Sequence, residues 1–174
     1  GDVQRWVENG IGTMVYGDDT EGWKKYSGEW SEGLESGKGL VEYKNGDIYE
    51  GDFKASQFDG KGTFKFKDGD KYVGEFKLSQ FHGKGKYFYT HGGYYDGEWK
   101  KDEYNGFGIL VSSDKSTYKG NFLNDQYNGY GQETMENEIY YGNFKDNKRD
   151  GKGILKFKDR KDEYQGIFKD GEIT

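Results

Sequence analysis

The sequence has no cysteine and only two histidines among its 174 residues. Without cysteine, disulfide bonds and thiolate metal sites are excluded, and the composition is compatible with a reducing compartment. Leucine, isoleucine and valine, the usual residues of a globular core, are scarce, and hydrophobic residues make up only 31% of the chain. No apolar run approaches transmembrane length, and no signal peptide is visible. We therefore expect a cytoplasmic protein whose fold does not depend on an aliphatic core.

The net charge of −6 is distributed unevenly along the chain. Residues 1–53 carry 5 basic and 12 acidic side chains, a balance of −7. Residues 54–101 carry 10 and 6, a balance of +4, and residues 102–174 carry 11 and 14, a balance of −3. An acidic chain is a poor general ligand of nucleic acid or of an anionic membrane. We therefore expect no nucleic-acid partner, and only the middle section could attract anionic lipid.

Aromatic residues are plentiful, at 18% of the chain, and they follow a period. The pattern Tyr-x-Gly-x-(Phe or Trp) recurs in steps of 22 to 24 residues. It starts at Tyr26, Tyr49, Tyr72, Tyr95, Tyr118, Tyr140 and Tyr164. A Gly-x-Gly pair follows each of the first six, and Gly10-Ile11-Gly12 precedes them all. Self-similarity at a fixed period of this size indicates a repeat architecture.

The repeats predict one domain, a single array over residues 1–174 with about six complete repeats. Residues 1–25 form a partial first repeat, in which the link from Gly17 to Lys25 carries a turn insertion of four residues. Residues 164–174 form a partial last repeat. Because Gly1-Asp2-Val3 matches the tail of the tyrosine signature, and the last signature, from Tyr164, has no second half after it, we expect the native protein to extend beyond both ends.

Within one repeat the side chains alternate with a period of two, which predicts β-strands. Hairpins in register would place Tyr49 opposite Phe64, Gly51 opposite Gly62 and Phe53 opposite Gly60. Rings would then lie over or beside the glycines of neighbouring strands. Turns such as Lys44-Asn45-Gly46-Asp47 suit tight hairpins. The predicted fold is all-β: an elongated, twisted, single-layer antiparallel β-meander of stacked hairpins of about 23 residues.

The segment Tyr72-Val73-Gly74-Glu75-Phe76, leading to His82-Gly83-Lys84-Gly85, resembles the MORN (membrane occupation and recognition nexus) repeat. The resemblance covers essentially the whole chain. It implies an elongated single-layer β-sheet that serves as a binding or assembly module in ciliary, cytoskeletal or junctional scaffolds, sometimes beside an enzyme domain. The chain departs from the pattern at Leu34-Glu35-Ser36, and Ser112 and Glu133 replace rings expected on the aromatic face.

The aromatic face is the first candidate site, because a single-layer sheet has no second layer to cover it and exposed apolar area usually marks an interaction surface. Alternatively, these rings satisfy one another and form the only core. We expect both, with a core at the base and a groove above it that takes a helix or an extended peptide. The candidates are Tyr49, Phe53, Phe64, Phe66, Tyr72, Phe76, Tyr87, Tyr89, Tyr95 and Trp99.

Two smaller sets of apolar residues are further candidates. Phe58, Phe81, Tyr104 and Tyr127 recur before each Gly-x-Gly pair, where they either seal the hairpin ends or contact a partner. Phe107, Ile109 and Val111 lie on the face that is otherwise charged. They contact either a neighbouring segment or a partner, which in a homodimer would be a second copy. Open sheet edges are another route to assembly.

A row of lysines suggests a lipid-binding face made of Lys61, Lys65, Lys84 and Lys86. The alternative is cross-strand ion pairing, since the predicted register places Lys61 opposite Asp52 and Lys84 opposite Glu75. Alternating acids would cancel most of the field that draws a protein to anionic lipid.

No pattern predicts catalysis, a cofactor or a metal site. Neither histidine has a serine or cysteine nucleophile in a recognisable motif, and the carboxylates follow the repeat as a solvated face would. The Gly-x-Gly pairs lie within predicted strands and precede no helix, so they are not phosphate loops.

The sequence therefore predicts a non-enzymatic scaffold or adaptor that binds a protein segment, in a cytoskeletal or ciliary assembly. The alternatives are a membrane-targeting module that binds anionic phospholipid and the regulatory arm of a larger enzyme.

Overall fold

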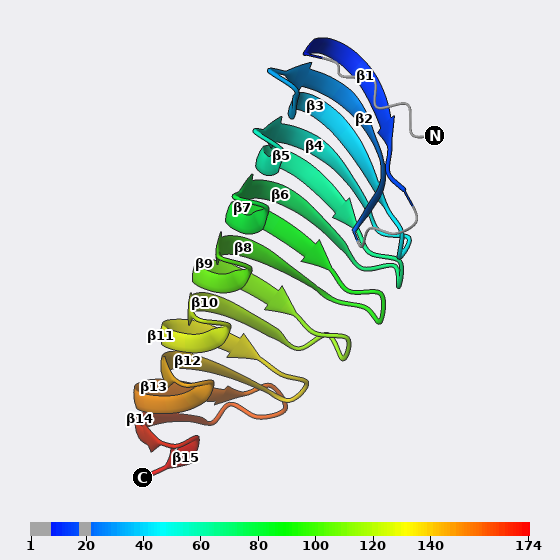
Figure 1. Cartoon of the computed structure of the whole chain (residues 1–174). Coiled ribbons are helices and arrows are strands. Elements are labelled where there is room, and N and C mark those ends of the chain that lie inside the picture. Colours follow the sequence, from blue (N-terminus) through cyan, green and yellow to red (C-terminus); the bar gives the residue numbers. More distant parts are fainter. Residues whose placement is uncertain (1–7, 18–21) are drawn as a thin grey trace. The chain divides into compact units, whose positions relative to one another are not determined.

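The structure is a computed structural model that describes residues 8–17 and 22–174. These residues form strands joined by turns, and no helix occurs among them. The chain divides into two compact units, residues 1–90 and residues 91–174. Within each unit the strands lie side by side in the order of the sequence, each antiparallel to its neighbours (Figure 1). The predicted all-β antiparallel meander is therefore confirmed in both units.

Each half of the 23-residue period forms one strand. The first unit contains β1 (Asn9–Val15), β2 (Trp23–Ser31), β3 (Leu34–Tyr43), β4 (Ile48–Lys54), β5 (Gln57–Lys65), β6 (Lys71–Lys77) and β7 (Gln80–Phe88). The second contains β8 (Tyr94–Lys100), β9 (Glu103–Val111), β10 (Thr117–Leu123), β11 (Gln126–Thr134), β12 (Glu138–Lys145), β13 (Lys148–Phe157), β14 (Glu163–Lys169) and β15 (Glu172–Ile173).

Two sequence predictions concern residues outside the described ranges. The match of Gly1-Asp2-Val3 to the tyrosine signature falls within residues 1–7, and most of the turn insertion falls within residues 18–21. The strands on either side of that insertion, β1 and β2, pair from Asn9 with Ser31 to Val15 with Lys25.

The β4–β5 hairpin confirms two of the three predicted residue pairs, Tyr49 with Phe64 and Gly51 with Gly62. The third prediction is wrong, because Phe53 pairs with Phe58 and not with Gly60. Between these pairs β4 advances by two residues and β5 by four, which is a β-bulge. Both steps are even, so the bulge preserves the alternation of faces and leaves no trace in the sequence pattern.

The first glycine of each Gly-x-Gly pair from Gly37 onwards lies at such a bulge. Gly60 has a φ of +113°, in a region that residues other than glycine rarely adopt. The equivalent glycines also have positive φ. The strand therefore turns sharply there, and the long strands begin with a tightly curled segment, as β7 and β11 show in Figure 1. The curl folds the hairpin end over the inner face of the sheet, which is the face that carries the signature tyrosines.

The second glycine of the pair is required for a different reason. A Cβ atom on Gly62 would lie 2.5 Å from Cε2 of Tyr49, so the tyrosine ring lies directly against the glycine backbone. Gly51, within the tyrosine signature, is paired with Gly62 on the neighbouring strand, and a Cβ atom on Gly51 would likewise collide with Tyr49. Glycine is usually unfavourable in a strand, but here it makes room for a ring.

The signature tyrosines form the centre of the core. The first six are at most 1% exposed. Each hydroxyl donates a hydrogen bond to the backbone carbonyl three residues later, as Tyr49 does to Asp52 at 2.8 Å and Tyr72 to Glu75 at 2.7 Å. Asp52 lies at the bulge, and its backbone is not paired with any residue of β5. The tyrosine hydroxyl therefore satisfies a backbone carbonyl that the strand pairing leaves free.

Other rings enclose each tyrosine. Phe58 stacks on Tyr49 at a centroid distance of 3.7 Å, and the edges of Phe53 and Phe76 meet the same ring at 5.2 and 5.0 Å. The stack recurs where Phe81, Tyr104 and Tyr127 cover Tyr72, Tyr95 and Tyr118. Stacked and edge-to-face arrangements each contribute about 0.5–1.5 kcal/mol beyond area burial. The residues before each Gly-x-Gly pair therefore seal the hairpin ends, the first of the two alternatives that the sequence left open.

The two ends of the meander use different turns. At the curled end, two-residue turns have positive φ at both central residues, as at Ala55 (+47°) and Ser56 (+63°), which is the type I′ geometry of tight hairpins. At the other end, the strands are joined by three-residue loops. In one of these loops Gly46 has a φ of +99° and donates its N–H to the carbonyl of Tyr43. The Asn-Gly pair thus marks a hairpin as predicted, but in the longer of the two turn types.

Replacing Gly62 by alanine should destabilise the first unit. The new Cβ would collide with the ring of Tyr49, which stacking and a hydrogen bond hold in place. We expect urea denaturation, followed by circular dichroism, to show a loss of about 1–3 kcal/mol in the free energy of unfolding, as overpacked cores do. Thr63→Ala, on the opposite face of the same strand, is the control and should cost about 0.5 kcal/mol or less. Equal stability of the two variants would contradict the packing assigned to Gly62.

Alkaline pH should unfold the protein through its buried tyrosines. Burial raises the pKa of Tyr26 to about 12 and raises the pKa of Tyr49 and Tyr118 still further. As the pH rises above the ordinary value of 10.0, the unfolded chain loses these protons before the folded one, so stability is complete below pH 10 and declines above it. Tyrosinate absorbance should therefore rise together with the loss of the β-sheet dichroism signal. Ionisation of all sixteen tyrosines near pH 10 with an intact dichroism signal would refute this linkage.

Candidate functional site

The structure divides the predicted aromatic face into buried rings and accessible rings. Six of the ten predicted rings are at most 5% exposed and form the expected core at the base of this face. They are covered by the curled hairpin ends and by one another, and they stabilise the fold instead of offering a contact surface. These six are Tyr49, Phe53, Tyr72, Phe76, Tyr95 and Trp99.

The other four rings, Phe64, Phe66, Tyr87 and Tyr89, are half-buried and belong to the first unit. They lie on the inner face, towards the three-residue loops and away from the curled ends. Their ring centroids follow one another at 4.6 Å from Phe64 to Phe66, 5.8 Å from Phe66 to Tyr87 and 4.8 Å from Tyr87 to Tyr89. They therefore form a continuous apolar strip that runs from the end of β5 to the end of β7.

Two rings that were not predicted extend this strip. Tyr43, at the end of β3, lies 5.7 Å from Phe64, and Trp23, at the start of β2, lies 6.5 Å from Tyr43. Tyr43 stands 23 residues before Phe66, so the period itself could have identified it. Trp23 follows the turn insertion, which displaces it from the period. We call these six half-buried side chains the aromatic row: Trp23, Tyr43, Phe64, Phe66, Tyr87 and Tyr89.

A hydrogen bond fixes the hydroxyl of Tyr87 within the row. The hydroxyl of Tyr87 donates to Oδ2 of Asp70 at 2.7 Å, and Oδ1 of Asp70 accepts from the backbone N–H of Thr90 at 2.7 Å. Burial, followed by the hydrogen bond to Asp70, raises the pKa of Tyr87, and burial raises the pKa of Tyr43. Both phenols are therefore neutral near pH 7, and the row presents uncharged rings.

The second unit carries different side chains at the equivalent inner positions, including Ser112 and Glu133. Glu133 accepts hydrogen bonds from Arg149 at 2.7 and 2.9 Å, and Glu138 accepts another at 2.6 Å. The guanidinium of Arg149 lies 4.9 Å from the ring centre of Tyr140, in the position that Phe58 occupies over Tyr49. A salt-bridged cation thus replaces the stacking ring of this repeat, which accounts for the departure at Glu133.

The lysines proposed for lipid binding lie on the outer face, opposite the aromatic row. Lys61, Lys65 and Lys84 are exposed and Lys86 is half-buried. Lys61 is paired across the sheet with Glu75, and its backbone N–H donates to Oδ2 of Asp52 at 2.8 Å. Lys61 therefore lies between two acids, whereas Lys65 is paired with Lys71 and Lys86 with Val73.

The partners within this row differ from those predicted. Asp52 is paired with Lys38 of the preceding repeat, and the two side chains form an ion pair. Glu75 pairs with His82 in its own hairpin, so the placement of Lys84 opposite Glu75 is wrong. The bulge at the Gly-x-Gly pair causes both differences, because it moves the acid out of register with the lysine of its own hairpin.

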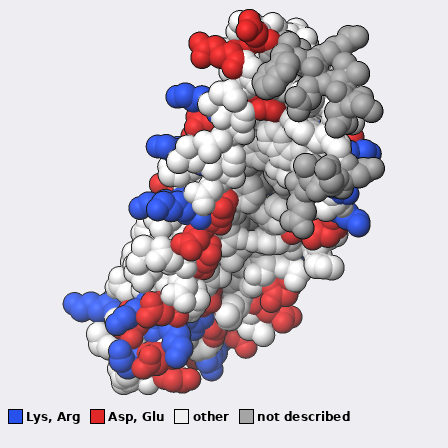
Figure 2. Space-filling model, in the orientation of Figure 1, with Lys and Arg blue, Asp and Glu red and all other residues white. Residues whose placement is uncertain are grey.

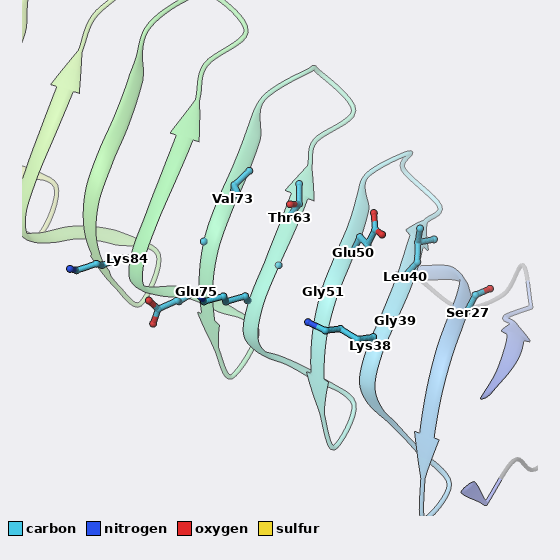
Figure 3. A pocket seen from close by; sticks show the side chains of 13 residues that line it. Ser27, Lys38, Gly39, Leu40, Glu50, Gly51, Thr63, Val73, Glu75 and Lys84 are labelled. Atoms are coloured by element: carbon cyan, nitrogen blue, oxygen red, sulfur yellow. The ribbon is translucent and has the colours of Figure 1, made fainter. Parts of the chain in front are cut away.

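A groove of about 1060 Å³ crosses the outer face of the first unit (Figure 3). Its floor is the backbone of glycines such as Gly39 and Gly51, and its rims are the side chains on either side of them. Lys38, Glu75 and Lys84 stand on one rim in Figure 3, and Leu40, Glu50, Thr63 and Val73 stand on the other. On the face shown in Figure 2, basic side chains lie beside acidic ones at several places.

The apolar triplet of β9 also lies on the outer face. Phe107 is exposed, whereas Ile109 and Val111 are half-buried. Tyr130, which was not predicted, is exposed at the position equivalent to Phe107 and borders a second groove of about 470 Å³. This groove crosses the outer face from β11 to β14 and includes Tyr141, Ile154 and Ile167. Its signal in the sequence was the residue between the two glycines, which is a ring at Phe107 and Tyr130, an isoleucine in β1 and a lysine in the other four pairs.

Nothing in the described part of the chain resembles a metal or catalytic centre. No group of three or more His, Asp or Glu side chains is arranged there to hold a metal ion. His91 is exposed in a turn, and His82 lies within β7 beside Glu75. No helix in that part of the chain is long and apolar enough to cross a membrane.

Comparison with known families agrees with this geometry. The MORN repeat model matches residues 26–48, 49–71, 72–94, 95–117, 118–137 and 140–160. The chain belongs to the MORN-repeat family. Each matched MORN repeat begins within the first strand of a β-hairpin, at one of the first six signature tyrosines. No curated protein matches the chain.

MORN repeats form a repeat-based binding module, and the family is generally non-catalytic. This agrees with the predicted resemblance, and it directs attention to the surfaces that the MORN array presents. In the first unit these are the aromatic row on the inner face and the charged groove on the outer face. In the second unit it is the apolar groove on the outer face.

Arg149→Leu should destabilise the second unit, because it leaves Glu133 and Glu138 without their cation in a partly buried site. We expect a loss of about 2–4 kcal/mol in the free energy of unfolding, somewhat less than a fully buried pair costs. The double variant Arg149→Phe/Glu133→Phe restores the two rings found at Phe58 and Phe64, and it should recover most of the loss. Thermal and urea denaturation would measure both. A double variant no more stable than Arg149→Leu would show that the cation does not substitute for a ring.

Proposed function

We propose that this MORN-repeat protein is a non-enzymatic adaptor that holds a segment of a partner protein along the aromatic row. The observation that carries the proposal is the row itself: six half-buried rings in continuous contact on one face of the first unit. Contiguous apolar surface of this kind usually marks an interaction site. Tyrosine and tryptophan are also the side chains that most often dominate binding energy.

An amphipathic helix fits the row better than an extended peptide. The row runs across the strands from β2 to β7, about five strand spacings or roughly 24 Å. A ligand lying in that direction crosses the strands and finds no sheet edge to pair with, so it must satisfy its own backbone hydrogen bonds. A helix does so internally, and about 16 residues would cover the row at 1.5 Å per residue. Apolar side chains at every third or fourth position would face the rings.

The wider role is proposed from the family. An array that carries a binding surface and has no catalytic centre among its described residues suits a scaffold that joins other proteins. We propose a cytoplasmic scaffold in a cytoskeletal or ciliary assembly, as the resemblance to MORN-repeat scaffolds implies. Lipid targeting through the lysines and regulation of a larger enzyme stay predictions. The alternation of Lys61 with Glu75 and of Lys38 with Asp52 argues against a strong attraction to anionic lipid.

The test compares Phe66→Ser/Tyr89→Ser, which interrupts the aromatic row, with Phe107→Ser/Tyr130→Ser, which removes two exposed rings from the outer face. All forms are first checked for folding by circular dichroism and then used for affinity capture from native lysate. We expect a captured protein that the outer-face variant retains and the row variant binds at least tenfold more weakly, a difference of about 1.4 kcal/mol. The binding should persist at high ionic strength, because the rings are uncharged.

Two outcomes would reject the proposal. One is a captured protein whose affinity is the same for the row variant and the wild type. The other is binding to anionic vesicles alone, which is lost at high salt and in Lys61→Glu/Lys84→Glu. That result would assign function to the lysines on the outer face.

A further inference from the structure

An aspartate lies between two rings of the aromatic row. Asp47 immediately precedes β4, and its carbonyl accepts a hydrogen bond of 2.9 Å from the N–H of Tyr43, a ring of the row. On the other side, its Oδ1 accepts a hydrogen bond of 2.8 Å from the N–H of Lys67, the residue that follows Phe66. Burial raises the pKa of Tyr43, and the charge of Asp47 adds to this rise. The carboxylate of Asp47 therefore lies beside the row.

A second aspartate repeats this placement one period later. Asp70 immediately precedes β6, and its carbonyl accepts a hydrogen bond of 2.9 Å from the N–H of Phe66. Its Oδ1 accepts from the N–H of Thr90, which follows Tyr89, and its Oδ2 accepts from the hydroxyl of Tyr87. Rings and acids thus alternate at the loop ends of the five strands from β3 to β7. We call this the ring–acid line: Tyr43, Asp47, Phe66, Asp70 and Tyr89.

The inner face of β3 to β7 carries acids and no lysine. Every lysine within these strands shares the alternation of Lys61, so all of them point to the outer face. Lys44 and Lys67 lie in the three-residue loops. The charged residues that share the alternation of the signature tyrosines are Glu35, Asp47 and Asp70. Residues 54–101 have a net charge of +4, yet the face that holds the aromatic row is negative.

The spacing of the ring–acid line matches an α-helix. Neighbouring strands are about 4.8 Å apart, so the rings recur about every 9.6 Å and the acids lie halfway between them. A helix advances about 10.5 Å in seven residues and about 4.5 Å in three. A helix lying along the row would therefore place residues i and i+7 over two rings, and residue i+3 over the acid between them. These three positions share one face of a helix.

The carboxylates determine which side chain suits the position over them. The hydrogen bonds that Asp47 accepts come from neutral groups, the N–H of Lys67 and Nδ2 of Asn45. The hydroxyl of Tyr87, which donates to Asp70, is neutral as well. An apolar residue above either acid would cover a charge without pairing it, which is unfavourable. A lysine or arginine there can lay its aliphatic part along the rings and bring its cation to the carboxylate.

We propose that the helix held along the aromatic row is basic, with an apolar residue at every seventh position and a lysine or arginine three or four residues after it, so that its cations meet Asp47 and Asp70. This inference rests on the proposed function, because it names the chemistry of the segment that the row binds. The rings hold the helix, and the two acids select it, since they attract a basic helix and repel an acidic one.

A displayed peptide library tests the proposal on the 174-residue chain. Its members are helix-forming peptides of about 18 residues, enough to cover the row. They carry leucine or tryptophan at every seventh position, and lysine, glutamate or glutamine at each of the others. We expect binding to enrich lysine about tenfold over glutamate at the third or fourth residue after each apolar one. Equal frequencies there would overturn the proposal, as would lysine enriched equally at every position, because net charge alone explains that result.

Replacing the two acids locates the effect. Asp47→Asn/Asp70→Asn removes both charges and keeps an oxygen for each backbone N–H. After a check of folding by circular dichroism, it should bind the most enriched peptide about tenfold more weakly in fluorescence anisotropy at low salt. Glu50→Gln/Glu75→Gln, on the outer face of the same two strands, is the control and should bind like the wild type. Equal affinities of the two variants would overturn the proposal.

A third variant separates this inference from the proposed function. Phe66→Ser/Tyr89→Ser interrupts the rings and keeps both aspartates. Enriched peptides that need the rings but show no preference for lysine would leave the aromatic row as the site and overturn only the basic pattern. Peptides that bind this variant as tightly as the wild type bind elsewhere, and that result would overturn both. A library from which no peptide is enriched would likewise overturn both.

Discussion

The contact between a tyrosine ring and two glycine backbones is the constraint on which this fold depends. Neither glycine has a Cβ atom, so the ring can lie flat against the strand pair, and Tyr49 over Gly51 and Gly62 is the example. From that position its hydroxyl reaches the carbonyl of Asp52, which the bulge has freed from the sheet. The bulge in turn folds the hairpin end back, so that Phe58 can cover the second face of the ring. Because the chain has few aliphatic residues to bury, it builds its core from one such aromatic cluster in each repeat.

Two repeats show that the cover over the tyrosine can change while the tyrosine and glycines do not. Arg149 replaces the covering ring over Tyr140 and brings two glutamates with it. Glu35 occupies the equivalent position near Tyr26 and is buried, where it accepts hydrogen bonds from the hydroxyls of Tyr16 and Ser56. Trp23, at the start of β2, instead stacks on the ring of Tyr26 in the same strand, at a centroid distance of 6.3 Å. Each departure from the repeat is accompanied by neighbours that satisfy the new group.

The sequence predicts the hairpins, their order and the face of each side chain, because these follow from a period of 23 and an alternation of two. It does not predict the bulge, since inserting an even number of residues leaves the alternation unchanged. The error in the partners of Phe53, Lys61 and Lys84 has this single origin. The bulge also decides which rings are accessible, because the folded-back ends bury Tyr72 and Phe76 while Phe66 and Tyr89 stay half-exposed. All four lie on the same predicted face, so alternation could not separate a core from a binding row.

The position between the two glycines of each repeat belongs to the surface and not to the core. Its side chain projects from the outer face and is exposed in every described repeat. It is Lys61 or Lys84 in the first unit, Phe107 or Tyr130 in the second, and Ile11 in β1. A substitution there alters the chemistry of the surface without disturbing the core. Each repeat therefore offers one surface position that can be substituted with little loss of stability, so new binding specificity can arise by single substitutions.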